Sequence, residues 1–448
     1  MNAVRIEIPE KVKRILDTLT AAGFEAYVVG GCVRDALLQR EPSDWDVTTD
    51  ASPQQVKSLF SRTVDTGIAH GTVTIMMGKE GFEVTTFRID GKYEDSRHPK
   101  EVTFTSSLEE DLKRRDFTIN AMAFSPSAGL VDLFGGTKDL EDKVVRCVGE
   151  AHERFQEDAL RILRAVRFSA QLGFSVEEKT AEAIRERART LERISAERIQ
   201  TELLKILLSP NPRTIRMAWE YGITKIILPE FDRCMDTPQN TPHHCYTVGE
   251  HILHSLSEVE NNRILRLTML LHDIGKPVVR TTDENGRDHF KMHGPVGEQM
   301  AGDILRRLKF DNDTIRSVTH LIKWHDYRPE PDERHVRRAV SRIGEEYFPL
   351  FLKVQRADIL AQSTWLRAEK LERLDSVEKC WREILEKKQC VSLKTLAVTG
   401  KDLQAAGIPS GKQMGEILHR LLEQVLDNPG DNEREILLKR AKEAFFLE

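Results

Sequence analysis

Residues 24–49 constrain the fold more than any other stretch, because an apolar run ends in a double glycine and a D-x-D tripeptide follows at residues 44–46. The apolar run predicts a strand, and Gly30 and Gly31 would let backbone N–H groups approach a phosphate where this strand meets a helix. On a second strand, aspartates spaced two apart would point to the same face. Such carboxylates repel each other unless a cation lies between them, and hard oxygen ligands suit Mg²⁺. The stretch therefore predicts a metal and phosphate site.

The aspartates of this tripeptide are Asp44 and Asp46, and taken alone they also fit a polar turn before a strand. The motif G-G-x-x-R-D just upstream favours the metal site, and it places Arg34 in the first turn of the predicted helix. A further predicted strand carries Glu83, which would add a third carboxylate beside the pair if the two strands are neighbours. An exposed strand glutamate is the alternative for Glu83.

The composition is that of an ordinary globular protein, with 448 residues, 40% hydrophobic and 31% charged, and this length predicts about three domains. The six cysteines include no C-x-x-C pair, so we expect reduced thiols and a cytoplasmic localisation. No run approaches the roughly 20 apolar residues of a membrane span, so we expect no membrane partner. Because the net charge is −5, any binding of nucleic acid must use local basic patches. We expect no DNA partner.

Two adjacent arginines, Arg114 and Arg115, stand one residue before the apolar segment FTINAMAF. Their guanidinium groups would suit a triphosphate, because each can make two parallel hydrogen bonds to phosphate oxygens. A pair of surface arginines is the alternative. The pattern becomes helical after residue 150, so we expect the first domain to end there.

On the first helix predicted after residue 150, Asp158 and Arg161 are three residues apart and would be neighbours. A surface salt bridge is the ordinary interpretation of such a pair. The functional interpretation is that Asp158 accepts and Arg161 donates hydrogen bonds, so that together they read the edge of a nucleobase. Arg164 continues the same row. Arg167 lies almost opposite Asp158 on a continuous helix, so one flat base would not meet the whole row.

The motifs G-G-C-V-R-D, D-W-D, R-R-D-F-T-I-N-A-M-A and E-D-A-L-R occur in this order, and with them the chain resembles the class II tRNA nucleotidyltransferases, the CCA-adding enzyme family, which is similar to bacterial poly(A) polymerases. The resemblance implies an α+β fold with a small mixed-sheet nucleotidyltransferase head at residues 1–150. An all-α remainder would follow, with a neck at 151–225 for base recognition and RNA binding, an HD-like body at 226–345 and a tRNA-binding tail at 346–448.

The same resemblance implies template-independent addition of CCA to the 3′ end of tRNA from CTP and ATP, with release of pyrophosphate. By that likeness Asp44 and Asp46 are catalytic and hold Mg²⁺, with one ion activating the tRNA 3′-hydroxyl and a second stabilising the pyrophosphate. The implied nucleotide-binding residues are Gly31, Arg34, Arg115, Asp158, Arg161, Arg164 and Arg167. The motif E-D-S-R-H-P at residues 94–99 resembles the mobile loop of the family, which favours full CCA addition. CC-only addition, A-only addition and poly(A) synthesis are the alternatives.

A second set of metal-binding residue types lies between residues 243 and 358. The order of a histidine, then a His-Asp pair, then an aspartate resembles an HD phosphohydrolase domain. A lone histidine without this context would indicate a structural residue. In that family the ligands of a divalent metal would be His244, His272, Asp273 and Asp358. Histidines 251, 293 and 325 leave a binuclear site open.

This second resemblance leaves two further alternatives. The helical body either retains its ligands without useful turnover or has phosphatase or phosphodiesterase activity. The chain as a whole could instead be chiefly an HD metal-dependent phosphohydrolase with an RNA-binding head, although Asp44, Asp46 and Arg115 favour nucleotidyl transfer. The sequence leaves the oligomeric state open.

Overall fold

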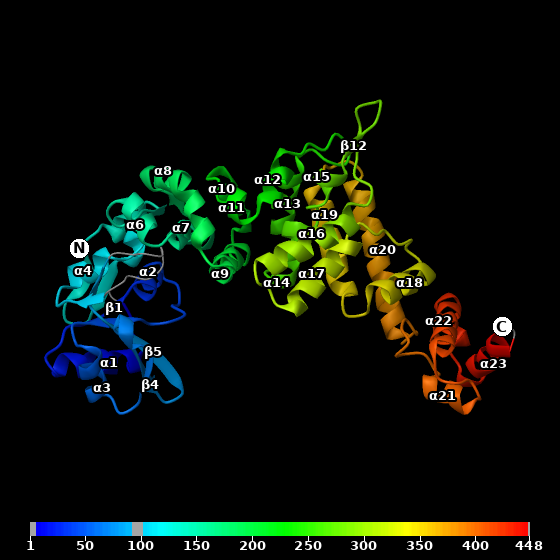
Figure 1. Cartoon of the computed structure of the whole chain (residues 1–448), viewed down its shortest axis with the longest axis horizontal. Helices are drawn as coiled ribbons and strands as arrows, with labels where there is room; N and C mark the ends of the chain where they lie inside the picture. Colours follow the sequence, from blue (N-terminus) through cyan, green and yellow to red (C-terminus); the bar gives the residue numbers. More distant parts are fainter. Residues whose placement is uncertain (1–5, 92–101, 447–448) are drawn as a thin grey trace. The chain divides into compact units, whose positions relative to one another are not determined.

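The computed structural model of the chain describes residues 6–91 and 102–446. It contains two compact units, Met1–Pro229 and Glu230–Glu448, and Figure 1 shows strands gathered in the first unit and helices throughout the second. The loop motif at residues 94–99 lies outside the described residues, so its expected part in full CCA addition stays a prediction.

A seven-stranded mixed sheet forms the centre of the first unit. The strands are β1 (Ala26–Val29), β2 (Val47–Thr49), β3 (Thr63–Gly67), β4 (Thr72–Met77), β5 (Glu80–Thr86), β8 (Met122–Ser125) and β9 (Gly129–Asp132). They lie in the order β3-β4-β5-β2-β1-β8-β9, and β2 runs parallel to β5 while the other neighbours are antiparallel. Valine and threonine fill β2, because branched side chains fit a pleated, buried surface. β2 is therefore the middle strand, with three strands on either side.

Short helices pack against this sheet, and each begins or ends at a local sequence feature. Helix α1 (Glu10–Ala21) buries four apolar residues spaced three or four apart, which gives it one apolar face. Helix α3 (Pro53–Leu59) begins at Ser52, whose side chain accepts a hydrogen bond from the Gln55 N–H in a capping box. The other elements of the region are α2 (Gly31–Leu37), β6 (Arg88–Asp90), β7 (Val102–Phe104), α4 (Leu108–Lys113) and α5 (Gly136–Glu141).

The rest of the first unit is mainly helical, and its first predicted helix is in fact two helices. Helix α6 (Ala151–Glu157) ends at Asp158, whose backbone is extended with φ −139° and ψ 105°, and α7 (Leu160–Leu172) begins two residues later. The break arises because the Asp158 side chain accepts a hydrogen bond from the Leu160 N–H at 3.0 Å and so caps α7. The other elements of this region are β10 (Val144–Val145) paired with β11 (Ser175–Val176), α8 (Glu178–Arg187), α9 (Ala196–Leu207), α10 (Ile215–Glu220) and α11 (Thr224–Ile227).

Helices make up most of the second unit. They are α12 (Pro229–Asp236), α13 (Val248–Ser257), α14 (Arg263–Leu271), α15 (Lys276–Val279), α16 (His293–Arg307), α17 (Asn312–Trp324), α18 (Glu333–Ile343), α19 (Phe348–Ala361), α20 (Arg367–Glu386), α21 (Gly400–Ala405), α22 (Lys412–Asp427) and α23 (Arg434–Phe446). A short hairpin of β12 (Thr281–Thr282) and β13 (Asp288–His289) interrupts them. One hydrophobic core joins buried residues from Leu321 to Ala441.

The expected fold class, a small mixed-sheet head followed by helical segments, is confirmed. The four expected domain boundaries stay predictions, and the shared core from Leu321 to Ala441 links the helices on either side of the boundary expected at residue 345. Within residues 6–91 and 102–446, the helices include none with the length and hydropathy needed to cross a bilayer.

Candidate active site and a second histidine cluster

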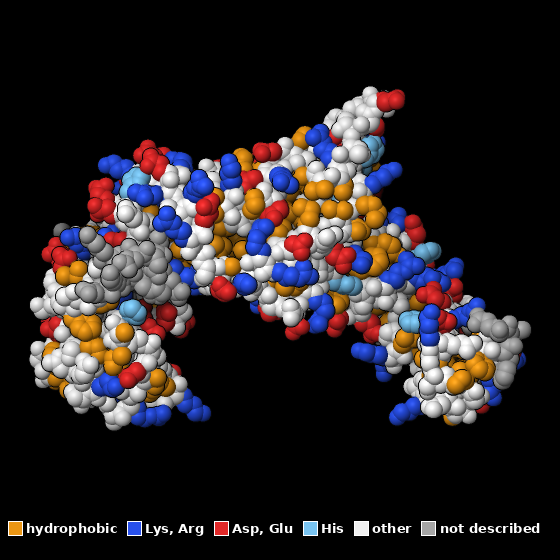
Figure 2. Space-filling model, viewed as in Figure 1, with side chains coloured by type: hydrophobic (Ala, Val, Ile, Leu, Met, Phe, Trp, Pro, Cys, Tyr) orange, Lys and Arg blue, Asp and Glu red, His pale blue; other side chains and the backbone are white. Residues whose placement is uncertain are grey.

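A pocket of about 870 Å³ in the first unit gathers the candidate residues of the head and of the helices that follow it. Eight of its lining residues are arginines, whereas Figure 2 shows basic and acidic side chains interspersed over the visible surface. This is the local basic patch that RNA or nucleotide binding requires of an acidic chain. The sequence-predicted residues that line it are Gly31, Arg34, Asp44, Asp46, Arg115, Asp158, Arg161, Arg164 and Arg167.

The double glycine forms one edge of this pocket. Gly30 has φ 81° and ψ −127°, a backbone conformation that is open to glycine and strained for other residues. Its N–H donates to the carbonyl oxygen of Met122 at 3.1 Å, which ties the turn to β8. A Cβ at Gly30 would lie 2.9 Å from Nη1 of Arg115, so the missing side chain makes room for that guanidinium group.

The aspartate pair lies immediately before β2 and not within it, which corrects the expectation that the strand itself carries both residues. The chain is still held beside β1, because the Val29 N–H donates to the carbonyl oxygen of Asp46 at 3.0 Å. Both Asp44 and Asp46 line the pocket. Loss of hydration and repulsion from Asp44 raise the pKa of Asp46 to about 6, although Arg115 opposes this shift. The two carboxylates therefore crowd each other, as a pair that binds a cation would.

Glu83 lies on β5, the strand beside the segment that carries the aspartate pair. A third carboxylate beside the pair required this position of Glu83. The parallel register of β2 and β5 pairs Val47 with Val84, so the residues that precede them, Asp46 and Glu83, are at the same level. The charge of Glu83 also contributes to the raised pKa of Asp46. The Glu83 carboxylate thus lies near that of Asp46 at this end of the middle strand, and its side chain is exposed.

The arginines of the pocket are fixed by acidic or amide partners. Arg34 forms two hydrogen bonds to the Asp35 carboxylate and donates from Nη1 to Oδ1 of Asn120 at 2.7 Å. Arg115 lies 3.4 Å from the buried carboxylate of Asp111. The ring of Phe168 lies under Arg167, with 4.2 Å from the guanidinium carbon to the ring centroid, and under Arg34 at 5.1 Å. These groups are held in place before any ligand arrives.

The side chains of Asp158 and Arg161 each pair with a different residue, so the ordinary interpretation of a salt bridge between them is wrong. Arg161 donates to Glu157 and to the carbonyl oxygens of Arg154 and Arg114. Asp158 instead accepts a hydrogen bond from Nη2 of Arg198 at 2.6 Å. The sequence did not indicate Arg198, because nothing in its helix distinguishes it from a surface arginine.

The two remaining arginines of the row also have buried acidic partners. Arg164 pairs with Asp116, and Arg167 donates to Oε1 of Glu202 at 3.0 Å. Arg167 lines the same pocket as Asp158 because the chain breaks at Asp158, so the angular separation expected along one continuous helix does not apply. Burial and the charge of Arg164 lower the pKa of Arg167 to about 10.

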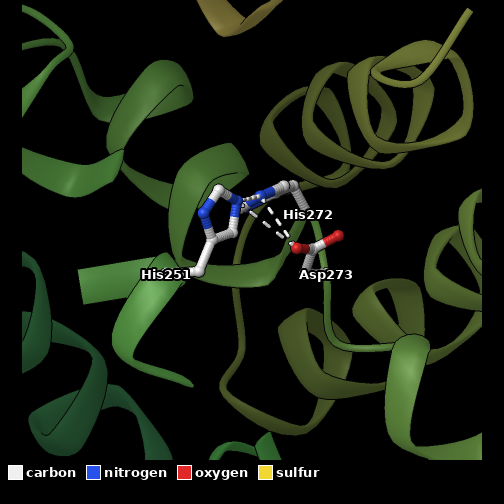
Figure 3. A group of neighbouring side chains, drawn as sticks. All are labelled: His251, His272 and Asp273. Atoms are coloured by element: carbon white, nitrogen blue, oxygen red, sulfur yellow. Dashed lines mark hydrogen bonds and ion pairs between the residues drawn. The ribbon is translucent and has the colours of Figure 1, made fainter. Parts of the chain in front are cut away.

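A cluster of buried histidines and aspartates lies within the second unit. Figure 3 shows His251, His272 and Asp273 with their polar atoms turned toward one another. Their ligand atoms lie within 4.8 Å of each other, and the same holds for Asp273, His293 and His325. Asp358 joins the first group, since its Oδ1 lies 2.9 Å from Nε2 of His251.

His244 was the expected first ligand of this cluster, and the structure does not bring it into either group. It lies beside the cluster, with its ring centroid 5.0 Å from that of His251. Burial and the charge of Lys276 lower the pKa of His244 to about 2, so the ring is neutral. His251, the fourth residue of α13, faces the interior and occupies the position that the sequence assigned to His244.

Comparisons with known proteins find matches in both units. The profile of the poly A polymerase head domain matches residues 26–146, that of the probable RNA and SrmB-binding site of polymerase A matches residues 173–235, and that of the putative tRNA nucleotidyltransferase domain 2 matches residues 292–441. The first match spans the sheet and the aspartate pair. The second covers α9 with Arg198.

Whole-length similarities extend to individual proteins. The chain is 35% identical over 445 residues to the CCA-adding enzyme of Enterococcus faecalis, and 35% identical over 454 residues to that of Ligilactobacillus salivarius, with 97% of each chain covered in both cases. A crystal structure of the Bacillus stearothermophilus CCA-adding enzyme in complex with CTP superposes with a TM-score of 0.71 at 28% identity and covers 98% of both chains. The chain therefore belongs to the family of CCA-adding enzymes.

Proposed function

We infer that the chain is a tRNA nucleotidyltransferase that adds CCA to the 3′ end of tRNA from CTP and ATP and releases pyrophosphate. The observation that carries this conclusion is the convergence of the Asp44–Asp46 pair and the Asp158 and Arg161 side chains in one arginine-rich pocket. A metal-binding carboxylate pair suits phosphoryl transfer, and a fixed donor and acceptor suit the edge of a base. The solved Bacillus stearothermophilus relative, which binds CTP, supports the same substrate class.

In the proposed reaction Asp44 and Asp46 hold Mg²⁺, and Glu83 adds a third carboxylate at the same end of the sheet. The ions would activate the tRNA 3′-hydroxyl and neutralise the charge of the departing pyrophosphate. The Arg34 and Arg115 side chains bind and orient the triphosphate, because both line the pocket in fixed positions. The chain thus contributes positioning and charge, which is most of what phosphoryl transfer requires of a protein.

Base selection is assigned to Asp158 and Arg161. The Asp158 carboxylate can accept from an exocyclic amino group, which cytosine and adenine both carry, and the Arg161 guanidinium group can donate to a ring nitrogen or carbonyl oxygen. Arg164 and Arg167 complete the lining of the pocket. Because protein side chains read the base, no template strand is needed. The cytoplasmic localisation expected from unpaired thiols fits this role and stays a prediction.

The experiment that tests this function uses three tRNA transcripts, which lack all three terminal nucleotides, the last two, or only the final A. Each is incubated with Mg²⁺ and labelled CTP or ATP. We expect C to be added to the first two and A to the third. Incorporation of C alone would reduce the activity to CC addition, repeated A would indicate poly(A) synthesis, and no incorporation would overturn the proposal.

A matched variant separates chemistry from folding in this test. Asp44→Ala removes one carboxylate of the pair, so we expect nucleotide addition to be abolished while tRNA binding and the melting temperature stay near those of the wild type. Asp65→Ala is the control, because Asp65 is an exposed carboxylate on β3 that pairs with Lys57. Loss of tRNA binding together with addition would assign Asp44 a folding role instead.

We also propose that the histidine cluster binds a divalent metal and supports phosphohydrolase activity. The observation that favours this second function is the convergence of His251, His272, Asp273 and Asp358 in a fully buried group. Changing His272 and Asp273 together to alanine should remove metal-stimulated phosphatase activity and leave CCA addition intact. Phosphatase activity that persists in this double variant would refute the assignment.

A further inference from the structure

The ring of Phe168 lies among three of the arginines that line the pocket of the first unit. The guanidinium carbon of Arg167 is 4.2 Å from the ring centroid, that of Arg34 is 5.1 Å away and that of Arg164 is 5.4 Å away. All four side chains line the pocket. A phenylalanine ring attracts a cation within about 6 Å of its centroid, because its π electrons make the face of the ring negative. One ring therefore attracts three cations at once.

The three arginines belong to two helices that the ring connects. Arg164 and Arg167 precede Phe168 on α7, whereas Arg34 lies on α2, the helix that follows the double glycine. The Phe168 side chain is itself held in place, because it is buried and meets the ring of Phe117 in a T-shaped contact with 5.7 Å between the centroids. Arginines from both helices thus gather around one fixed ring.

Hydrogen bonds connect two of these arginines by a second route. Nη1 of Arg34 donates to Oδ1 of Asn120 at 2.7 Å, and Nδ2 of Asn120 donates to Oδ1 of Asp116 at 3.1 Å. Nε of Arg164 donates to the other oxygen of Asp116 at 2.7 Å. These bonds fix the direction of individual N–H groups, whereas the ring attracts each guanidinium charge as a whole and uses none of its N–H donors.

Three cations in so small a space repel one another. Burial lowers the pKa of Arg167 to about 10, and the positive charges of Arg164 and Arg34 add to this shift. Each of the three arginines already has a carboxylate partner, which is Asp35 for Arg34, Asp116 for Arg164 and Glu202 for Arg167.

An aromatic ring offsets this repulsion in a way that suits a phosphate site. A further carboxylate would also offset it, but would cancel the charge that attracts a triphosphate and would occupy N–H donors. The Phe168 ring carries no net charge and accepts no hydrogen bond in the plane of a guanidinium group. It therefore leaves the charge and the remaining donors available to phosphate oxygens.

We propose that Phe168 is a positioning residue of the nucleotide site, whose ring keeps Arg34, Arg164 and Arg167 together to bind the triphosphate. The inference rests on the proposed function, nucleotide addition from CTP and ATP in this pocket, and adds the residue that assembles the triphosphate contacts. The base readers are held by other partners, since Asp158 pairs with Arg198 and Arg161 with Glu157. Phe168 acts through the three arginines and needs no contact of its own with the nucleotide.

A buried phenylalanine can also be an ordinary core residue, and the two roles have different requirements. Filling space requires only volume and an apolar surface, whereas holding cations requires the negative face of the π system. Fluorine atoms on the ring withdraw electron density from its face and change its volume little. Fluorination therefore weakens the attraction for arginine while the ring still fills its place in the core.

The test replaces Phe168 alone, in the full-length chain, by phenylalanine with one, two or three fluorine atoms on the ring. Calorimetry with Mg²⁺ measures the Kd for CTP and for ATP, and inorganic tripolyphosphate is added as a competitor. We expect both Kd values to rise with each fluorine, by about tenfold over the series, and tripolyphosphate to lose affinity in parallel. KM should rise more than kcat falls, and the ratio of CTP to UTP incorporation should stay at the wild-type value.

The same fluorinated residues at Phe155 are the matched control, because Phe155 is fully buried on α6 and does not line the pocket. We expect wild-type Kd values throughout this control series. A constant Kd across the Phe168 series, or an equal rise in both series, overturns the proposal and assigns Phe168 to the core. A higher Kd for CTP with an unaltered affinity for tripolyphosphate overturns the assignment to the triphosphate. An unmodified chain that adds neither C nor A overturns the proposed function instead.

Leucine substitutions give a second measurement with ordinary amino acids. Phe168→Leu removes the ring and keeps an apolar side chain, so the KM for CTP and ATP should rise about tenfold or more. Phe155→Leu leaves a similar gap in the core, so it should lower the melting temperature and leave KM unchanged. An equal rise of KM in the two variants overturns the proposal, and the fluorinated series decides the question if Phe168→Leu does not fold.

Discussion

Asp158 is held by Arg198, whose Nη2 donates to Oδ2 of the aspartate at 2.6 Å. The other carboxylate oxygen of Asp158 accepts the Leu160 N–H at the start of α7. One side chain therefore caps a helix and is fixed by a second helix, α9. This arrangement presents the carboxylate to the pocket in a single orientation, which base discrimination requires.

The first prediction concerns Arg198. Replacing it with alanine removes a charge-assisted hydrogen bond worth about 2 kcal/mol, so kcat/KM for CTP and ATP should fall about tenfold or more, and incorporation of UTP and GTP should rise. Arg198→Lys should recover part of the loss. Arg189→Ala is the control, because Arg189 is exposed and pairs with Glu192. Unchanged kinetics and selectivity in Arg198→Ala would show that Asp158 needs no support from α9.

The second prediction concerns Glu83. If this glutamate helps to hold Mg²⁺, Glu83→Gln should lower kcat by about 100-fold, the scale of losing one group that stabilises transition-state charge, and should raise the Mg²⁺ concentration needed for half-maximal activity. Glu80→Gln is matched to it, because Glu80 lies on the same strand and pairs with Lys11 at the surface. An unaltered Mg²⁺ dependence in Glu83→Gln would show that Glu83 is an ordinary strand residue with no part in binding Mg²⁺.

The third prediction concerns Gly30. Alanine at this position meets a backbone conformation that costs about 1–3 kcal/mol, and its Cβ would press on Arg115 at 2.9 Å. We expect Gly30→Ala to lower the melting temperature and also to raise the KM for nucleotide. Gly78→Ala shares a positive φ, at 72°, but no atom lies near its Cβ, so it should lower stability alone. Equal activity losses in the two variants would assign the effect to backbone strain.

The fourth prediction concerns acid stability. Burial opposes the charged form of Asp116, but Arg164, Asn120 and Arg161 hold the pKa of this carboxyl well below its usual range. A lowered folded-state pKa stabilises the protein above the unfolded pKa of about 4, and the contribution is lost as the pH falls below it. Asp116→Asn should therefore lower the free energy of unfolding by about 2 kcal/mol at pH 7, and less at pH 3.

Urea unfolding of wild type and variant at both pH values measures this effect. Asp142→Asn is the comparison, because Asp142 is half-exposed and pairs with Lys138, so its loss should matter little at either pH. A difference between wild type and Asp116→Asn that is the same at pH 7 and pH 3 would contradict the titration of Asp116.

The sequence predicted the fold class and most of the pocket because the relevant patterns are local. Glycines at a strand end, carboxylates spaced two apart and a change from alternating to helical periodicity each act within a few residues. The pairing of β2 with β5, which brings Glu83 beside Asp46, joins segments far apart in the chain. The sequence alone therefore supports two interpretations of Glu83.

Two details of the site differ from the sequence prediction, the first for a local reason and the second because tertiary contacts decide it. The helical pattern predicts an interior helical position for Asp158. An aspartate before an apolar run is also typical of a helix start, and this interpretation places the break between α6 and α7 at Asp158. The resemblance to an HD domain indicates His244 as the first ligand and His251 only as a further histidine. The chain at His244 precedes α13, so only the packing of α13 and α19 shows which ring reaches the interior.

The position of the aspartate pair at the start of the middle strand also bears on how the head unfolds. Strands at the edges of a sheet open at low free energy, whereas the central ones exchange their amide hydrogens only when the whole unit opens. Fraying at β3 or β9 would leave Asp44 and Asp46 at their spacing, because two strands separate β2 from the edge strand on each side of the sheet. Heat inactivation of nucleotide addition should then follow the cooperative unfolding of the sheet and show no earlier, local phase.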